Sequence, residues 1–429
     1  MNQNIRLRFS ELRVPLKMTF RHASAARTHG ESLWVEASRG PLLGYGEGCP
    51  RSYVTGETRS SCKQWLATWH EAIQSECTGL EALQAWVVEH TSDIDKSPSA
   101  WCAIECALLD LFARENGQSV EELLGLSPPG GPHVYSAVLG NDEAWKTRFL
   151  IDQYCILGLK DFKLKLGGDL EIDRQKLCSL TELTASHGVS DYRVRVDANN
   201  LWSGAPDLAL DYLRALDCEF FGIEEPVKPR DAERHSQISL GTATPIILDE
   251  SLCTMADLER YDGVAGRFMA NLKVSRVGGV LRGLTLVEAL RERGWPIIVG
   301  AHVGETSVLT RAAMLIAAAT GDRLAAQEGA FGSRLVEREP ASPSLKWGRG
   351  GSLDLRRRYA EVTTEGLQLT TPEVWMSGWG LACRSASRVR TESESVSVQA
   401  MSDGYGIHYR LWGPECGSDV LVVLHGGMS

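Results

Sequence analysis

Four short apolar runs in the middle of the chain each end in a charged residue, and helix-like sequence follows each of them. The charged ends are Asp197, Glu224, Asp249 and Lys273, separated by 27, 25 and 24 residues. A fifth run upstream, residues 161–165, carries two lysines. The interval equals one strand plus one helix, and a (β/α)8 barrel gathers functional groups from successive strand ends at its C-terminal mouth. The spacing therefore predicts an α/β fold built on a (β/α)8-type barrel.

The charges at these strand ends predict a metal site. Three carboxylates that converge on one point repel one another, and their pKa values rise unless a cation lies between them. Hard carboxylate oxygens with room left for water or substrate suit Mg²⁺, and Mn²⁺ accepts the same ligands. We therefore expect Asp197, Glu224 and Asp249 to surround a bound Mg²⁺ or Mn²⁺.

Two lysines predict proton transfer at this site. Lys165 and Lys273 belong to the second and sixth expected strands, which lie on opposite sides of an eight-strand circle. Lysines on either side of a metal-held carboxylate can remove and return a proton on the adjacent carbon, while the metal stabilises the enediolate. Burial beside cations is expected to lower the lysine pKa toward that of a useful base.

Five stretches together resemble the enolase superfamily in its muconate-lactonizing branch, the mandelate racemase/muconate lactonizing enzyme family. Each alone is more often a solvated strand face or a charged turn, but their order at barrel spacing is specific. The resemblance implies that the three carboxylates are metal ligands. It also implies that Lys165 and Lys273 are the acid/base pair, with Lys163 as an electrostatic helper. The matching stretches are Lys163–Lys165, Val196–Asn199, Ile223–Pro226, Leu248–Ser251 and Lys273–Gly279.

Substrate contacts are expected from loops around the barrel mouth. Family members cover the mouth with two loops of the N-terminal domain, which correspond here to residues 20–27 and 50–54. His302 and Glu328 end the seventh and eighth expected strands, and an imidazole there lines the pocket or supplies a proton. For each residue singly, a solvated or structural role is an open alternative. The substrate-binding candidates are Arg21, Arg51, Tyr53, Asn199, Glu250, His302 and Glu328.

The length of 429 residues predicts several domains, because one ordinary core does not grow so large. Three strand-like runs followed by helical patterns predict an α+β capping domain over residues 1–127, which resembles the N-terminal domain of the same superfamily. The barrel is expected over residues 131–340, and a return segment that packs on the cap over 341–381. Residues 382–429 are interpreted as a polar linker and a partial α/β-hydrolase-like segment. That segment ends before any nucleophile elbow, so hydrolase activity is not expected.

Composition limits the partners and the compartment. The formal net charge of −10 argues against nucleic acid as the main partner. No stretch approaches a membrane span, and the N-terminus lacks the apolar core of a signal peptide. The eleven cysteines show no Cys-x-x-Cys spacing, so a reducing cytoplasm without zinc or disulfides is the simplest setting. The expected partner is a small-molecule carboxylate, and a homo-oligomer is compatible with the sequence.

The leading hypothesis is Mg²⁺-dependent abstraction of the proton α to a carboxylate. This chemistry gives racemisation or epimerisation of an N-acyl amino acid or dipeptide, or cycloisomerisation. Dipeptide epimerases of this branch usually carry Asp-x-Asp at the eighth strand to bind the substrate ammonium, whereas this chain has Gln327–Ala330. Dipeptides therefore lose support unless Glu328 takes over that role. The alternatives are an o-succinylbenzoate synthase, which performs a syn-dehydration in quinone biosynthesis, and a barrel kept as a non-catalytic scaffold for a fused module.

Overall fold

Eight parallel strands form the centre of the protein, and their order in the sheet follows their order in the sequence. The computed structural model describes residues 4–22, 25–127, 131–355, 378–379, 382–383, 396–402, 405–411 and 423–425. A hydrogen bond from Ser136 N to Gln327 O (2.8 Å) joins the two ends of the curled sheet. The expected barrel fold is thus confirmed. The strands are β5 (Ala137–Leu139), β6 (Asp161–Lys165), β7 (Arg193–Asp197), β8 (Gly222–Glu224), β9 (Ile246–Leu248), β10 (Phe268–Leu272), β11 (Ile297–Val299) and β12 (Leu324–Gln327).

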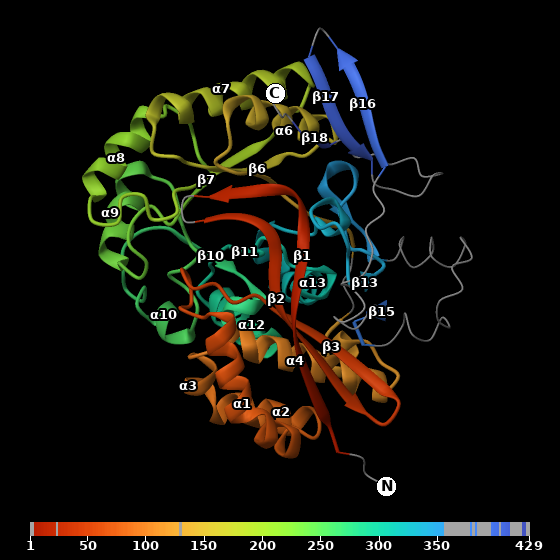
Figure 1. Cartoon of the computed structure of the whole chain (residues 1–429). Helices are drawn as coiled ribbons and strands as arrows, with labels where there is room; N and C mark the ends of the chain where they lie inside the picture. Colours follow the sequence, from red (N-terminus) through yellow and green to blue (C-terminus); the bar gives the residue numbers. More distant parts are fainter. Residues whose placement is uncertain are drawn as a thin grey trace.

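Helices lie outside this curled sheet (Figure 1) and shield it from water. Because both faces of a parallel sheet are covered, its strands are rich in apolar residues, and β9 and β11 are buried throughout. Side chains cap several helix N-termini, as Asp169 does for α7 and Thr306 for α13. The helices are α6 (Ala144–Ile156), α7 (Leu170–Ser186), α8 (Pro206–Ala215), α9 (Ala232–Thr242), α10 (Met255–Glu259), α11 (Val274–Val277), α12 (Val280–Glu292) and α13 (Ser307–Thr320). Short 3-10 turns are η1 (Gly321–Arg323), η2 (Gly332–Arg334) and η3 (Arg349–Gly351).

The N-terminal cap combines a three-stranded antiparallel sheet with helices, as the sequence predicts. Helix α4 is its core, because residues 98–113 of this helix are all buried. Gly44, Gly46 and Gly48 of β3 lie so close to α4 that a Cβ atom at any of them would collide with its backbone. The cap elements are β1 (Arg6–His22), β2 (Ala25–Arg39), β3 (Leu42–Gly48), α1 (Arg59–Glu76), α2 (Leu80–Glu89), α3 (Thr91–Ile94), α4 (Pro98–Glu115) and α5 (Val120–Leu123).

Two buried carboxylates of the cap bind the N-termini of barrel helices. Glu105 of α4 accepts hydrogen bonds from the backbone N–H groups of Val280 and Leu281 at the start of α12. Glu47 of β3 accepts from Thr306 N (3.1 Å) and Thr306 Oγ1 (2.6 Å) at the start of α13. A helix N-terminus carries unpaired N–H groups and a partial positive charge, so each carboxylate stabilises the junction. Cap and barrel therefore share a buried polar seam.

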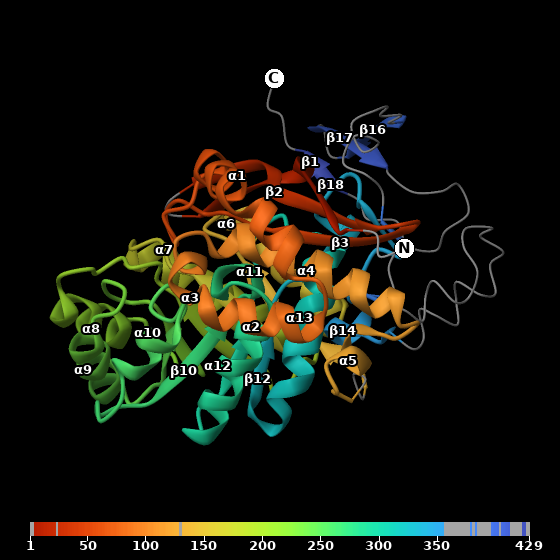
Figure 2. The same ribbon diagram turned by 90° about the horizontal axis from the view of Figure 1, so that it is seen from below.

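The long hairpin of β1 and β2 extends from the cap across one end of the barrel (Figure 1 and Figure 2). Lys17 N donates to Leu335 O (2.8 Å), and Leu16 forms a β-bridge with Val336. Both contacts tie the middle of the hairpin to the loop that follows β12. Because that loop leaves the carboxyl end of a strand, the hairpin covers the mouth of the barrel.

The expectation of a patternless loop at residues 20–27 is wrong. Strand β1 continues to His22, and β2 begins at Ala25. The pairing register shifts between Pro15 and Phe20. Such an irregularity interrupts the alternation of side chains between the two faces, so the strand leaves no regular pattern in the sequence.

The entry into the barrel also differs from the sequence pattern, which predicts one strand at residues 134–138. Strand β4 (His133–Val134) instead pairs antiparallel with β14 (Ser352–Leu353). Strand β5 then begins the barrel. The expected strand is therefore divided between a small outer sheet and the barrel.

A short segment beyond the barrel, residues 378–379, contacts the cap. Trp379 is buried, donates from Nε1 to Cys106 O (3.1 Å) and donates from its backbone N to Asp110 Oδ1 (2.7 Å). Strand β13 (Ala341–Ser342) pairs with β15 (Ala382–Cys383). A return strand expected at residues 367–372 lies outside the described residues, and the domain boundaries stay predictions.

The C-terminal tail contains a separate three-stranded antiparallel sheet. Its strands are β16 (Val396–Ser402), β17 (Tyr405–Leu411) and β18 (Val423–His425). The likeness of this tail to an α/β-hydrolase stays a prediction. In the part of the chain that the structure describes, no helix is both long and apolar enough to cross a membrane.

Deleting residues 385–429 is expected to leave the stability of cap and barrel nearly unchanged, because the cut falls after Trp379 and β15. A longer deletion of residues 378–429 also removes the buried Trp379 and should cost about 3–5 kcal/mol of unfolding free energy. Urea titration followed by tryptophan fluorescence compares both proteins with the full chain. Equal destabilisation by the two deletions would show that the tail beyond residue 384 is part of the enzyme core.

Candidate active site

Charged residues meet at the carboxyl ends of the barrel strands. Asp197 and Glu224 end β7 and β8, while Asp249 and Lys273 directly follow β9 and β10. In the strand register, Lys165 at the end of β6 lies beside Asp197, and Asp197 lies beside Glu224. Adjacent parallel strands therefore bring these groups to one end of the barrel.

The ammonium group of Lys163 lies at the centre of this cluster. Its Nζ atom is close to three carboxylates: Glu224 Oε1 (2.7 Å), Asp197 Oδ2 (3.2 Å) and Glu328 Oε1 (3.3 Å). Lys163 is 3% exposed, so water screens these charges poorly. Its positive charge therefore offsets the repulsion among the acids.

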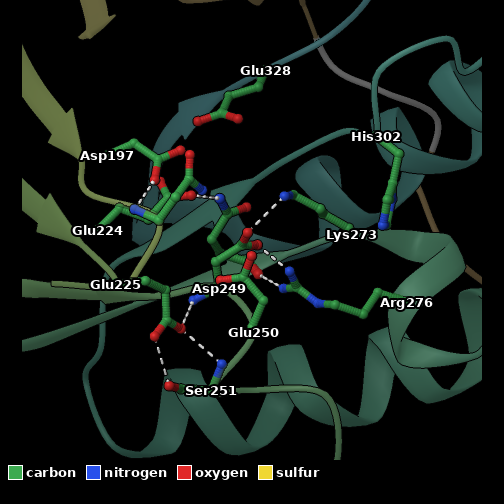
Figure 3. A network of polar contacts seen from close by, with 12 residues as sticks. Asp197, Glu224, Glu225, Asp249, Glu250, Ser251, Lys273, Arg276, His302 and Glu328 are labelled. Atoms are coloured by element: carbon green, nitrogen blue, oxygen red, sulfur yellow. Dashed lines mark hydrogen bonds and ion pairs between the residues drawn. The ribbon is translucent and has the colours of Figure 1, made fainter. Parts of the chain in front are cut away.

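Lys165 and Lys273 approach the cluster from opposite walls of the barrel. Lys165 Nζ donates to Asp197 Oδ2 (2.8 Å) and Asn199 Oδ1 (2.7 Å). Lys273 Nζ donates to Asp249 Oδ2 (2.8 Å), and Figure 3 shows this contact on the opposite side of the network from Asp197. The two lysines come from β6 and β10, the second and sixth of the eight strands.

Burial and opposite charge shift the pKa values of the acids in different directions. Burial raises the pKa of Glu224 to about 8; Asp197 and Asp249 add to the shift, and Lys163 opposes it. Burial also acts to raise the pKa of Asp197. Lys163 and Lys165 outweigh that effect and hold the pKa of Asp197 well below its usual range. Asp197 therefore carries a full negative charge beside a carboxyl group that is readily protonated.

Lys273 and Lys163 differ from the sequence expectation of a lowered lysine pKa. Burial acts to lower the pKa of Lys273, but the Asp249 carboxylate outweighs it and the pKa is raised. Neighbouring carboxylates likewise hold the pKa of Lys163 well above its usual range, against the effect of burial. Arg276 and Lys273 in turn hold the pKa of Asp249 far below its usual range.

The donor set of the cluster fits a hard divalent cation. Glu224 Oε2 and Glu250 Oε2 are buried and have no hydrogen-bond partner among the described residues. Unpaired buried carboxylate oxygens are costly, and an all-oxygen set favours Mg²⁺ or Mn²⁺. In the described part of the chain, no group of three or more His, Cys, Asp or Glu side chains is arranged to hold a metal ion as it stands. The carboxylates engage ammonium groups instead, as Lys163 does between Asp197 and Glu224.

Contacts behind the acids hold the turn after β9 (Figure 3). The Glu225 carboxylate accepts hydrogen bonds from Asp249 N (2.7 Å), Ser251 N (2.7 Å) and Ser251 Oγ (2.8 Å). Arg276 donates to the Asp249 carboxylate from the other side. Sequence reasoning assigned no role to Arg276, although it lies within the stretch Lys273–Gly279.

A second charged layer in the barrel centres on Arg195, which sequence reasoning missed. Arg195 is 1% exposed and lies two residues before Asp197 on β7. Its guanidinium donates to Ser136 Oγ (2.8 Å), Glu328 Oε1 (3.0 Å) and the Asp161 carboxylate. Alternation along β7 was the available signal, because every second side chain of a strand points to the same face.

Glu328, the acid that would have to take over binding of a substrate ammonium, belongs to this charged layer. Its carboxylate contacts both Arg195 and Lys163. Burial acts to raise the pKa of Glu328, but these two cations outweigh it and lower the pKa. Glu328 therefore has its charge neutralised within the barrel.

Arg51, another substrate-binding candidate, contacts the backbone of the protein. It is 2% exposed, and its guanidinium donates to three backbone carbonyls. The acceptors are Glu31 O (3.1 Å), Pro50 O (2.8 Å) and Val303 O (2.8 Å). Arg51 thus fastens the cap to the loop that follows β11.

The other two cap candidates are placed differently. Tyr53 is 44% exposed, and the Arg27 guanidinium lies 5.8 Å from the centre of its ring. Arg21 pairs with Ala26 near the end of the hairpin, and its side chain lies outside what the structure describes.

The remaining candidates lie at the mouth. Asn199 receives the hydrogen bond from Lys165 described above. Glu250 is 7% exposed, and burial, with Asp249 adding to it, raises its pKa to about 7. His302 is 8% exposed and lies beside Glu305. The structure therefore brings Asn199, Glu250, His302 and Glu328 to the cluster, whereas Arg51 lies in backbone contacts of the cap, and a role of each in substrate binding stays a prediction.

Comparison with known proteins agrees with this geometry. Residues 149–354 match the family described as "Enolase C-terminal domain-like". The L-Lys-D/L-Arg epimerase of Methylococcus capsulatus is 30% identical over 277 residues, which cover 62% of this chain and 73% of that protein. The chain belongs to the enolase superfamily. The resemblance found in the sequence is confirmed.

Two further members of the enolase superfamily show how far the likeness extends. The N-succinyl-L-Arg/Lys racemase of Bacillus cereus is 25% identical over 318 residues, which cover 71% of this chain and 81% of that protein. A solved structure, the dipeptide epimerase from Enterococcus faecalis V583 complexed with Mg and dipeptide L-Leu-L-Tyr, superposes with a TM-score of 0.69. That protein is 24% identical, and the likeness covers 89% of this chain and 100% of that chain. These relatives are isomerases, so the chain belongs to an enzyme family rather than to a group of scaffolds.

Replacing Arg195 by methionine should destabilise the fold by about 3–5 kcal/mol, because the change removes the buried cation that Glu328 and Asp161 share. Arg193→Met is the matched control on the same strand, since its side chain is 42% exposed and also contacts Asp161. It should cost less than about 1 kcal/mol. Urea denaturation measures both, and a loss at Arg195 as small as that at Arg193 would contradict the importance of the buried layer.

Proposed function

We propose that the protein is a Mg²⁺-dependent racemase or epimerase that moves the proton α to the carboxylate of an N-acyl amino acid. The observation that carries this proposal is the position of Lys165 and Lys273 on opposite walls of one carboxylate cluster. A carbon that loses its proton to one wall and regains it from the other changes configuration. The epimerase and racemase relatives support the same reaction class.

Asp197, Glu224 and Asp249 are the proposed metal ligands, and Mn²⁺ is the proposed substitute for Mg²⁺. A bound cation would stabilise the negative charge that develops on the substrate carboxylate as the proton leaves. The all-oxygen donor set and the unpartnered Glu224 Oε2 support this assignment. The Mg in the Enterococcus faecalis structure gives it further support.

Each lysine serves one face of the substrate. Lys165 is oriented by Asp197 and Asn199, and Lys273 is oriented by Asp249. One lysine takes the α-proton as a base, and the other returns a proton as an acid; the roles reverse for the opposite enantiomer. Lys163 remains buried among the acids, where it compensates their charge.

The charged layer below the cluster favours an acylated nitrogen without a free ammonium. The acid at the end of β12, Glu328, already contacts Arg195 and Lys163. An ammonium group at this position would compete with two buried cations for one carboxylate. N-acyl amino acids are therefore the leading substrate class, and dipeptides, which also carry an acylated nitrogen, come second.

A small-molecule carboxylate is the proposed partner, and a cytoplasmic location is proposed for the enzyme. Every cysteine whose side chain the structure describes carries a free thiol, which supports a reducing compartment. A homo-oligomer stays a prediction.

Calorimetric titration with Mg²⁺ tests the ligand assignment directly. The wild type should bind one ion, and Asp197→Asn, Glu224→Gln and Asp249→Asn should each weaken binding by at least about tenfold, because each removes a charged oxygen donor. Asp231→Asn, which changes the half-buried N-cap of α9, is the control. Each variant should keep its circular dichroism spectrum but lose turnover. Full activity after treatment with a chelator would exclude this metal site.

The two-lysine mechanism is tested by proton NMR in deuterated water with a panel of N-acyl amino acids and dipeptides. Wild-type protein should exchange the α-proton and invert its configuration. Lys165→Ala and Lys273→Ala should each abolish inversion, and each should retain exchange of only one enantiomer, from the surviving lysine. Turnover of a succinylbenzoate precursor without any exchange would identify a dehydratase instead.

A further inference from the structure

The loop between β11 and α13, residues 300–306, places His302 beside Lys273. Figure 3 shows His302 and Lys273 on the same side of the polar network. Burial, together with the positive charges of Arg51 and Lys273, holds the pKa of the imidazole well below its usual range. The ring is therefore neutral at physiological pH. A neutral imidazole has one nitrogen that donates a hydrogen bond and one that accepts.

Contacts with Glu305 decide which nitrogen is the acceptor. Glu305 Oε1 accepts a hydrogen bond from the backbone N–H of His302 (2.6 Å), and it lies 3.3 Å from His302 Nδ1. When Glu305 Oε1 carries no proton, it accepts from both the backbone N–H and the ring, and Nδ1 is then the donor. Burial raises the pKa of Glu305 to about 8, and the short contact of Oε1 with the backbone N–H favours Oε2 as the oxygen that carries the proton. The lone pair is therefore on Nε2.

His302 Nε2 is an acceptor to which the described part of the chain offers no donor. The nearby charged groups that affect the ring most are Arg51, Lys273 and Arg276, with Asp249 acting in the opposite sense. An acceptor nitrogen beside the proposed proton-carrying lysine is suited to a donor group on the substrate.

The cap holds the loop of His302 in place at several points. Arg51 donates to Val303 O (2.8 Å), and Glu47 binds the backbone N–H of Thr306 (3.1 Å). The backbones of Gly30 and Gly304 are in contact, so closely that a Cβ atom on either residue would collide with the other. The imidazole is thus fixed before any ligand arrives, and a fixed acceptor loses little entropy when it binds.

We propose that His302 Nε2 accepts a hydrogen bond from the N–H attached to the substrate's α-carbon, and that His302 thereby selects N-acyl amino acids. The inference rests on the proposed function, because the α-carbon must lie next to Lys273. The nitrogen is one bond from that carbon, within the region that His302 and Lys273 share. A site built around a buried acceptor rejects an analogue that lacks the matching donor. His302 is therefore a specificity-determining residue.

The test compares two substrates that differ only in this donor. One is the N-acyl amino acid of the NMR panel that exchanges its α-proton fastest, and the other is its 2-acyloxy acid analogue, in which oxygen replaces N–H. His302→Leu should lower kcat/KM for the amide by at least about tenfold and leave kcat/KM for the ester nearly unchanged. His302→Gln should retain most amide activity, because the side-chain oxygen of glutamine can accept at a position near Nε2.

His187→Leu is the matched control, because His187 is an exposed histidine that pairs with Asp152 on the outside of the barrel. It should alter neither substrate. Equal losses on amide and ester in His302→Leu would overturn the proposal, since His302 would then act through Lys273 or through the fold. Loss of amide activity in His302→Gln equal to that in His302→Leu would also overturn it.

A spectroscopic measurement separates this proposal from the proposed function. Protein labelled with ¹⁵N-histidine at neutral pH should show His302 with a protonated Nδ1 and a bare Nε2. Adding the N-acyl amino acid with Mg²⁺ should shift the Nε2 signal, whereas the 2-acyloxy acid should not. If the Nε2 signal shifted but wild-type protein exchanged no α-proton, the proposed function would be wrong while the hydrogen bond to His302 would stand. A protonated Nε2, or no shift with the amide, would exclude the hydrogen bond in either case.

Discussion

The structure depends on the pairing of buried charges inside the barrel. Removing an ion from water costs several kcal/mol even after the protein relaxes, and a well-placed partner must offset that cost. Here Lys163 is shared by acids from β7, β8 and β12, and Arg195 joins β6, β7 and β12 in the layer below. Each cation therefore favours one register of the strands. The same pairing that supports the barrel also determines which carboxylates remain available at its mouth.

The site is completed by the seam between cap and barrel. Glu105 and Glu47 bind the first turns of α12 and α13, the helices that follow Lys273 and His302 in the chain. Arg51 binds the loop between β11 and α13 at Val303. The residues at the barrel mouth are thus held in position both by the strands that carry them and by the cap that covers them. Such pre-positioning keeps reacting groups within the narrow range of geometry that catalysis requires.

Sequence alone predicted the residues whose signal lies along the chain. Asp197, Glu224, Asp249 and the lysines were found because strand ends recur at a fixed interval, and the barrel followed from the same interval. Contacts between residues that are far apart in the sequence left no such signal. Val303, which Arg51 binds across the cap–barrel boundary, and Lys163, which Glu328 binds, each lie more than 130 positions from their partner, so these contacts were not visible in the sequence. The hairpin over the mouth was missed because a register shift broke its alternation.

The carboxylate of Glu105 has a consequence for how the protein can be recombined. It lies at the start of α12 beside Gly279, where a Cβ atom would collide with it. The glycine and the acid belong to different domains, yet neither can be changed freely while the other stays. A cap transplanted from a relative would therefore need an acceptor side chain at the position of Glu105 that fits against Gly279. Without it, the N–H groups at the start of α12 would lose their hydrogen-bond acceptor. A functional exchange between relatives must therefore include both contacting surfaces, the one on the cap and the one on the barrel. A cut at the linker between the two domains would separate residues that have to match.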